Sequence, residues 1–310
     1  MLKKFSGILF FVLVLAFVSY YRFDIATYLI ENVIFQKESI EFKRNEYSKN
    51  TSYEYFKIEN DFVVESQTDI INTIYTILDS GMSEYSFTCS DDYEMCQFDV
   101  EKISTDSKAL SILNNFVHPY NSYNKLYISS NNMGKIRVSV DKLYSEEEIK
   151  YIEEQISLIS STVLNDTMTD VQKLKSFHDY IINSFSYDTE RANEIKQNIY
   201  TENKLMSHKA NGAFLNKIAL CSGYTDIMAI FINKLNLTNY KISTNEHIWN
   251  AVNINNTWFH IDLTWDDPIT DTGEPMLLDE FFLISQVDLV NKKTGQHNFE
   301  GLVYKEIAIK

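Results

Sequence analysis

A cysteine, a histidine and an aspartate follow one another in the C-terminal part of the 310-residue chain, at Cys221, His247 and Asp262. Thiol catalysis uses these residue types in defined roles: the cysteine attacks a carbonyl carbon, the histidine moves the proton, and the aspartate holds the imidazole in one tautomer. The stretch from Cys221 to Pro268 also holds all three tryptophans of the chain. The order of these residues predicts attack of a thiol nucleophile on a carbonyl group.

Cys221 is expected at the start of a helix. Apolar residues follow it at helical spacing, at Tyr224, Ile227, Met228, Phe231 and Leu235. The unpaired backbone N–H groups and the positive dipole end at a helix start favour a thiolate over a thiol. The same N–H groups can receive the oxyanion of an acyl-transfer intermediate.

Two strands joined by a tight turn are expected to carry the histidine and the aspartate. The strands are predicted at residues 245–254 and 257–264, and Asn255 and Asn256 between them suit a two-residue hairpin loop. The face predicted to point to the core carries Ile248, Asn250, Val252, Phe259, Ile261 and Leu263.

The register of this hairpin decides whether the base and the carboxylate can meet. A two-residue loop places His247 opposite Thr264 and Trp249 opposite Asp262. His247 and Asp262 are then diagonal neighbours on one face, at roughly 7 to 8 Å between backbones. A carboxylate can reach an imidazole across that gap, so the hairpin supports a Cys-His-Asp triad.

Each residue also has a simpler interpretation. A lone cysteine on an apolar helix is most often a small buried hydrophobe, and Asp262 can cap the turn that follows it. His260 lies on the same face as Asp262 and competes for the role of base, whereas His178, beside an apolar helical stripe, is expected to be structural. A zinc site of Cys221, His247 and Asp262 is chemically allowed, but nothing in the spacing selects for metal. We therefore expect no metal or other cofactor.

Three blocks of this region resemble the transglutaminase-like superfamily of papain-type thiol enzymes. They are CSGYT at 221–225, HIWN at 247–250 and WFHIDLTWDD at 258–267. The segment DEFFLIS at 279–285 is similar to the downstream strand of that family, and His297 is similar to a histidine often found after it.

The resemblance covers about residues 170 to 300 and implies an α+β fold, in which the helix carrying the cysteine packs on an antiparallel sheet. It implies Cys221, His247 and Asp262 as the catalytic residues and peptides or proteins as substrates. The superfamily contains transglutaminases, proteases and members without demonstrated activity. The alternative function is therefore a non-catalytic extracytoplasmic binding module on the same fold.

The chain is expected to have four parts: a signal anchor at 1–22, a spacer at 23–50, a small α+β domain at 51–143 and the transglutaminase-like domain at 144–310. The anchor is predicted from an uncharged apolar run that follows Lys3 and Lys4, and a cleaved signal peptide is the alternative. The positive charges before the run place the N-terminus inside and the bulk of the chain outside a cell membrane.

Composition limits the partners. The formal net charge of −15 excludes a nucleic-acid partner, because no basic stripe exists to neutralise phosphates. Cys89 and Cys96 are expected to form a local disulfide in an exported protein, which leaves Cys221 as the unpaired thiol. The extracytoplasmic location makes cell-wall peptides and surface proteins the candidate substrates.

Local patterns predict most of the other elements. In the small domain these are a strand at 53–64, a helix at 67–78, a strand at 85–89, a helix at 107–116 and a hairpin of 125–129 with 135–140. Capping boxes at Ser145 with Glu148 and at Thr169 with Gln172 each predict the start of a helix. Residues 187–216 lose periodicity and are expected to form a polar loop or broken helix.

Overall fold

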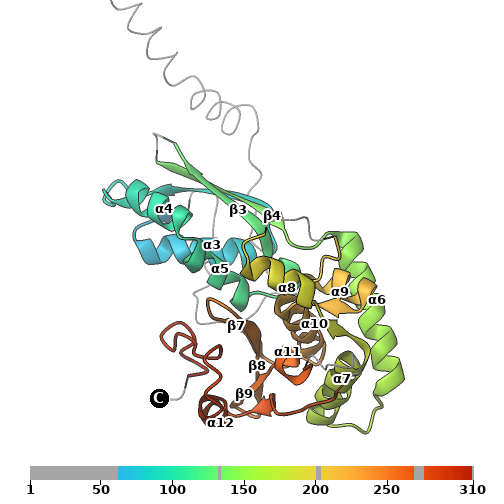
Figure 1. The fold of residues 1–310 in the computed structure, drawn as a ribbon. Helices are drawn as coiled ribbons and strands as arrows, with labels where there is room; N and C mark the ends of the chain where they lie inside the picture. Colours follow the sequence, from blue (N-terminus) through green and yellow to red (C-terminus); the bar gives the residue numbers. More distant parts are fainter. Residues whose placement is uncertain (1–61, 132–133, 200–203, 269–275, 309–310) are drawn as a thin grey trace, which may run out of the picture.

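The computed structural model describes residues 62–131, 134–199, 204–268 and 276–308 (Figure 1). The predicted anchor, the spacer and nearly all of the predicted strand at 53–64 lie outside these residues. Within the described ranges, no helix is both long and apolar enough to cross a membrane. The described chain has an α+β fold with two four-stranded sheets.

The first sheet has the strand order β1-β2-β4-β3 and mixed direction. It consists of β1 (Val63–Val64), β2 (Glu84–Cys89), β4 (Lys135–Lys142) and β3 (Tyr123–Ser130). β1 runs parallel to β2, and the other pairs are antiparallel. The predicted hairpin is confirmed as β3 and β4, and Gly134 in its turn has φ +75°, a conformation that favours glycine.

Helices α3 (Gln67–Asp79), α4 (Cys96–Thr105) and α5 (Ser107–Phe116) accompany this sheet. The structure confirms the predicted helices at 67–78 and 107–116, whereas α4 was not predicted. Asp106 separates α4 from α5, and its side chain accepts a hydrogen bond from the Ala109 N–H at 2.9 Å, which fixes the start of α5. The predicted disulfide joins Cys89 at the end of β2 to Cys96 at the start of α4.

The second sheet is antiparallel and has the order β10-β9-β8-β7. It consists of β7 (Asn239–Ser243), β8 (Ile248–Ile254), β9 (Thr257–Ile261) and β10 (Phe282–Ile284). Asn255 and Asn256 have φ 52° and 64°, so both central turn residues are left-handed, as a type I′ turn requires. The predicted register of the β8–β9 hairpin is confirmed, since Ile254 pairs with Thr257 and Asn250 with Ile261.

The ends of this hairpin differ from the prediction. β8 begins at Ile248, so His247 precedes the strand, and β9 ends at Ile261. Helix α11 (Leu263–Asp266) begins where β9 was predicted to continue, because the side chain of Asp262 caps the first N–H groups of the helix. The predicted pairing of His247 with Thr264 was therefore wrong.

Most of the remaining helices lie in the C-terminal half of the described chain. Both predicted capping boxes are confirmed, at the starts of α6 (Glu146–Val163) and α7 (Asp170–Ser184). The region predicted as a polar loop or broken helix contains the end of β5 (Ser186–Tyr187) and two separate short helices, α8 (Thr189–Lys196) and α9 (Ala210–Asn216). The broken-helix alternative is therefore the one that fits, and α8 buries none of its residues, so no apolar stripe marks it in the sequence. The chain continues with β6 (Ile218–Ala219) and α10 (Cys221–Lys234), and α12 (Gln286–Asn291) follows β10.

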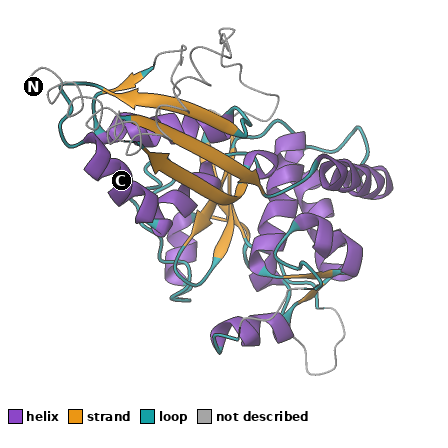
Figure 2. Ribbon diagram, turned by 90° about the horizontal axis from the view of Figure 1, so that it is seen from above, coloured by secondary structure: helices purple, strands orange, loops and turns teal. Residues whose placement is uncertain are grey.

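Buried residues form two clusters, one on each face of the second sheet. Trp249 and Ala251 belong to the cluster that also contains α3, α4 and α5, whereas Val252 and Ile261 belong to the cluster that contains α10. Strands thus lie between groups of helices (Figure 2). The prediction of one core-facing side was incomplete, because the face that carries Trp249 is buried as well.

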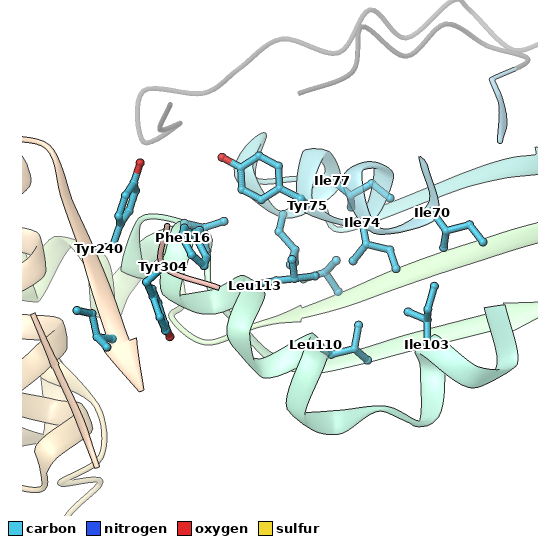
Figure 3. Packing of buried hydrophobic residues seen from close by; sticks show 14 of the residues in the cluster. Ile70, Ile74, Tyr75, Ile77, Ile103, Leu110, Leu113, Phe116, Tyr240 and Tyr304 are labelled. Atoms are coloured by element: carbon cyan, nitrogen blue, oxygen red, sulfur yellow. The ribbon is translucent and has the colours of Figure 1, made fainter. Parts of the chain in front are cut away.

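The first cluster joins residues from distant parts of the sequence. Phe116 of α5 packs against Tyr240 of β7 and Tyr304 near the C-terminus, with ring centroids 5.1 and 5.4 Å apart (Figure 3). Asn115 adds a 2.7 Å hydrogen bond to the Tyr304 hydroxyl. This cluster crosses the predicted boundary between 143 and 144, and the division into two domains stays a prediction.

Candidate active site

Cys221 is the first residue of α10, as predicted, and its thiol is free and partly buried. The residue before it, Leu220, has no side chain that can cap the helix. The first helical hydrogen bond runs from the Tyr224 N–H to the Leu220 carbonyl at 3.0 Å. The N–H groups of residues 221–223 precede that bond, so they have no acceptor within the helix and are donors beside the thiol.

Backbone contacts fix the position of this helix start. β6 pairs in parallel with β5, and the Leu220 N–H donates to the Ser207 carbonyl at 2.9 Å. A Cβ atom on Gly223 would lie 2.3 Å from the Ser207 carbonyl oxygen. Only glycine fits at this position, since that oxygen belongs to the backbone and cannot swing away as a flexible side chain would.

His247 contacts Asp262, as the hairpin predicted. The His247 Nε2 atom lies 2.5 Å from the Asp262 Oδ2 atom, and the two residues are only 6% and 2% exposed. A turn holds the histidine, because its backbone N–H donates to Thr244 Oγ1 at 3.1 Å and its carbonyl accepts from the Thr244 N–H at 2.9 Å. The contact is a buried, charge-assisted hydrogen bond.

Asp262 caps a helix as well as binding the imidazole. Its Oδ1 atom accepts from the N–H groups of Thr264 and Trp265, at 3.0 and 3.2 Å, at the start of α11. Its Oδ2 atom contacts His247 and also the Nε2 atom of His297, at 2.8 Å. The capping interpretation and the catalytic interpretation of this residue are therefore compatible.

The charges around His247 favour an imidazolium. Burial lowers the pKa of His247, but the charge and hydrogen bond of Asp262, together with the hydrogen bond and charge of Cys221, outweigh burial and raise it to about 10. Burial raises the pKa of Asp262, whereas the charges and hydrogen bonds of His247 and His297 lower it to about 2. Because Nε2 is bound to Asp262, Nδ1 is the ring atom left to interact with Cys221.

His260, the competing base, is held elsewhere. Its Nδ1 atom accepts a hydrogen bond from the Trp249 Nε1–H at 3.0 Å, so its Nε2–H donates to the Gln286 Oε1 atom at 2.7 Å. Burial lowers the pKa of His260 to about 4, although the hydrogen bond that His260 donates to Gln286 raises it. With both ring nitrogens bound in this way, His260 is a neutral structural residue.

His178 links two helices. The side chain is fully buried, with Nε2 at 3.1 Å from Asp266 Oδ2 in α11 and Nδ1 at 3.0 Å from Asp179 Oδ1 in α7. The Asp266 carboxylate also accepts from the Phe281 N–H at 3.0 Å. These contacts agree with the predicted structural role, and they hold α11 in place behind Asp262.

The described residues contain one cluster whose donor types suit a metal ion, formed by His247, Asp262 and His297, with ligand atoms within 4.8 Å of one another. Cys221 is not part of it, unlike in the zinc alternative. Ligands around a tetrahedral zinc at ~2.0 Å lie roughly 3.3 Å apart. The observed N···O distances of 2.5 and 2.8 Å are shorter and are those of hydrogen bonds.

Tyr187 is a site residue that the sequence did not reveal. It pairs with Ala219 in the β5–β6 ladder, two residues before Cys221. Burial, followed by the charges of Cys221, Asp188 and Asp262, raises the pKa of Tyr187 to about 12, so its hydroxyl keeps the proton. A two-residue strand has too little periodicity to be recognised, and no other signal marked this tyrosine.

A cavity of about 710 Å³ lies next to the chain segments that carry His247 and His297. Its walls are one face of α5, the turn at 243–246 and the C-terminal segment at 295–304. A second cavity, also about 710 Å³, lies between the first sheet, the start of α6 and residues 206–209. Cys221, His247 and Asp262 line neither of these cavities.

Comparison with known proteins supports the resemblance. Residues 154–290 match the model of a family described as a transglutaminase-like domain. Cys221, His247 and Asp262 all lie within this matched range. Comparison with curated proteins gives no significant match.

Two solved structures are similar in part. A crystal structure of a TGase is 18% identical, with a TM-score of 0.34, and the match covers 58% of this chain and 51% of that one. A proposed cysteine protease from Cytophaga hutchinsonii is 10% identical, with a TM-score of 0.27, and the match covers 45% of this chain and 61% of that one. The chain thus spans about half the length of the first structure.

Proposed function

We propose that the chain is a thiol enzyme that acts on amide bonds of peptides or proteins through Cys221, His247 and Asp262. One observation carries the proposal: a buried carboxylate binds one nitrogen of His247, and the thiol at the start of α10 interacts with the same imidazole. A histidine that only packs in the core would not require a free thiol next to its ring. The match of residues 154–290 to a transglutaminase-like domain supports the same class.

The proposed reaction begins with a Cys221 thiolate and a His247 imidazolium. The sulfur attacks the amide carbonyl carbon, and the carbonyl electron pair moves to its oxygen. When the tetrahedral intermediate collapses, the C–N bond breaks and His247 gives its proton to the leaving amine, which leaves a thioester on Cys221. Water or a second amine then attacks the thioester, His247 takes the proton, and the thiolate leaves as the acid or the new amide forms.

The oxyanion of the intermediate needs donors close to the sulfur. The N–H groups at the start of α10 are suitable because the helix leaves them without acceptors. We propose the Tyr187 hydroxyl as a further donor, because it stays protonated and β5 holds Tyr187 beside Ala219, two residues before Cys221. We assign Tyr187 to this role within the proposal.

We also propose that the protein is attached to the cell membrane by residues 1–22, with the rest of the chain outside the cytoplasm. The Cys89–Cys96 disulfide supports this location, because disulfides persist in oxidising compartments. Cell-wall peptides or surface proteins would then be the accessible substrates.

Alkylation of Cys221 by iodoacetamide tests whether the thiol is activated. At pH 7 the wild-type protein is expected to react at least about tenfold faster than the His247→Gln variant, because an adjacent cation favours the thiolate. The glutamine keeps a hydrogen bond to Asp262 but carries no charge. An equally slow rate in both proteins would refute an activated nucleophile.

A binding module on the same fold is the second candidate. The cavity of about 710 Å³ beside α5 favours it, because Cys221, His247 and Asp262 do not line that cavity. A binding module would bind its ligand equally well after Cys221→Ala, and it would turn over no peptide or amine. Loss of both turnover and acylation in that variant, with turnover in the wild type, would exclude this alternative.

A further inference from the structure

Two imidazole rings meet on one oxygen of Asp262. His247 and His297 both bring Nε2 to the Oδ2 atom, at 2.5 and 2.8 Å, while the Oδ1 atom accepts the two N–H groups at the start of α11. The rings of the two histidines are nearly perpendicular, at 86°, with centroids 5.3 Å apart. The carboxylate is thus held on both oxygens.

Thr294 sets the orientation of the His297 ring. Its hydroxyl oxygen lies 2.6 Å from Nδ1, and Nε2 faces the carboxylate. An ionised carboxylate only accepts hydrogen bonds, so Nε2 must carry a proton; in the neutral imidazole the Thr294 hydroxyl then donates to Nδ1. The carboxylate therefore sets the tautomer, and the threonine hydroxyl holds the ring with Nε2 toward Asp262.

The surroundings leave His297 little freedom to move. The residue is 4% exposed, and its ring lies against Trp249, Trp265 and Phe281, with centroids 4.8, 5.2 and 5.2 Å away. An apolar side chain would fill such an aromatic cage without needing partners. The imidazole instead has a hydrogen-bond partner for each nitrogen, which indicates that its donor to Asp262 matters as well as its volume.

We propose that His297 is a positioning residue of the thiol enzyme, which holds the Asp262 carboxylate in the orientation that binds His247, with Thr294 holding the orientation of the His297 ring. The inference rests on the proposed function of Cys221, His247 and Asp262. It concerns a residue that need not touch the substrate, because His297 acts through Asp262. Without the His297 donor, the Oδ2 atom is free to turn away from His247, and the imidazole loses its alignment toward Cys221.

Four variants of the full-length chain separate a hydrogen-bond role from a packing role. His297→Gln keeps a donor near the position of Nε2, whereas His297→Leu keeps bulk and removes the donor. Thr294→Val removes only the hydroxyl that binds Nδ1 and holds the ring orientation. His260→Gln is the control, since His260 is an equally buried histidine that binds Trp249 and Gln286 in place of Asp262.

Two readouts are measured at pH 7 for each variant. The first is the low-field proton NMR resonance of the short His247–Asp262 hydrogen bond, and the second is the rate of Cys221 alkylation by iodoacetamide. His297→Leu is expected to lose the resonance and about 10- to 100-fold in rate, the worth of a hydrogen bond to a charged group. Thr294→Val should lose about half of that effect on a logarithmic scale. His297→Gln and His260→Gln should keep the resonance and stay within about threefold of the wild-type rate.

The outcomes distinguish this inference from the proposed function. If Cys221 of the wild-type protein does not react with iodoacetamide, the proposed function is refuted. The proton resonance of the His247–Asp262 hydrogen bond still tests whether His297 positions Asp262. If Cys221 of the wild type reacts, and His297→Leu has the same resonance and alkylation rate as the wild type, the role of His297 is refuted. The proposed function is not affected by that result. A folded His297→Gln that behaves like His297→Leu also refutes the role of His297. If His297→Leu does not fold, an unchanged resonance in Thr294→Val overturns the inference.

Discussion

Asp262→Asn is expected to reduce the acylation rate of Cys221 by about a thousandfold or more, as loss of an orienting carboxylate does in a catalytic triad. The amide oxygen can still cap α11 by accepting from Thr264 and Trp265. The amide NH₂ group then faces the N–H groups of His247 and His297. Hydrogen-bond donors point at one another there, and no acceptor lies between them. Relief of this conflict turns His247 to the tautomer that presents N–H, and no lone pair, to Cys221.

The same substitution is expected to destabilise the fold by about 3–5 kcal/mol, because it leaves a buried histidine without its charge partner. The free energy of unfolding from urea titration at pH 7 measures this loss. Asp267→Asn is the matched control: the Asp267 carboxylate accepts one 2.5 Å hydrogen bond from the Tyr224 hydroxyl, and an amide oxygen can accept that bond too. Equal losses of rate in the two variants would contradict the role given to Asp262.

The stability difference between the wild type and His247→Gln is expected to depend strongly on pH. The pKa of His247 is raised to about 10 in the folded protein, above the ordinary value of 6.5. A raised pKa contributes stability that is fully present below pH 6.5 and is lost as pH rises through about 10, by ~1.4 kcal/mol for each pH unit. Between pH 6.5 and about pH 10, the stability that His247 contributes is therefore expected to fall by several kcal/mol in total.

Urea titrations of both proteins at intervals from pH 6 to pH 10 measure this difference. The carboxylate partner stays ionised throughout, because the pKa of Asp262 is lowered to about 2; its own contribution is present above pH 3.8 and is lost as pH falls through about 2. A stability difference that stays constant over the measured range would show that His247 is neutral in the folded protein. That result would argue against the imidazolium in the proposed reaction.

Local patterns predicted the elements that hold the site, because the relevant interactions are short in sequence. The apolar spacing after Cys221 indicated α10, and Asn255 with Asn256 gave the register of the β8–β9 hairpin. The register brings the start of β8 next to the end of β9, so the approach of His247 to Asp262 was expected, although both residues lie just outside these strands. The end of β9 was harder to place, because Asp262 directly follows the strand, caps α11 and binds the imidazole of His247.

The parts that were missed depend on contacts between distant segments. No pattern near Tyr187 in the sequence predicts the short pairing of β5 with Ile218 and Ala219, which places Tyr187 next to Ala219, two residues before Cys221. His297 was noticed only for its resemblance to a family histidine, and its contact with Asp262 spans 35 residues. Ser207 approaches Gly223 from another loop, so the requirement for glycine there emerges only in three dimensions.

Formation of an acyl-enzyme on Cys221 is the most direct test of the central claim. The full-length chain is incubated with glutamine-containing peptides and, as an unselective activated donor, with p-nitrophenyl acetate, and the intact mass is followed over time. We expect a mass increase of one acyl group, located on Cys221 by peptide mapping, that is absent in Cys221→Ala and much slower in His247→Gln. A wild-type protein that gains no acyl group on Cys221 from any donor, or gains it no faster than His247→Gln, would contradict the account.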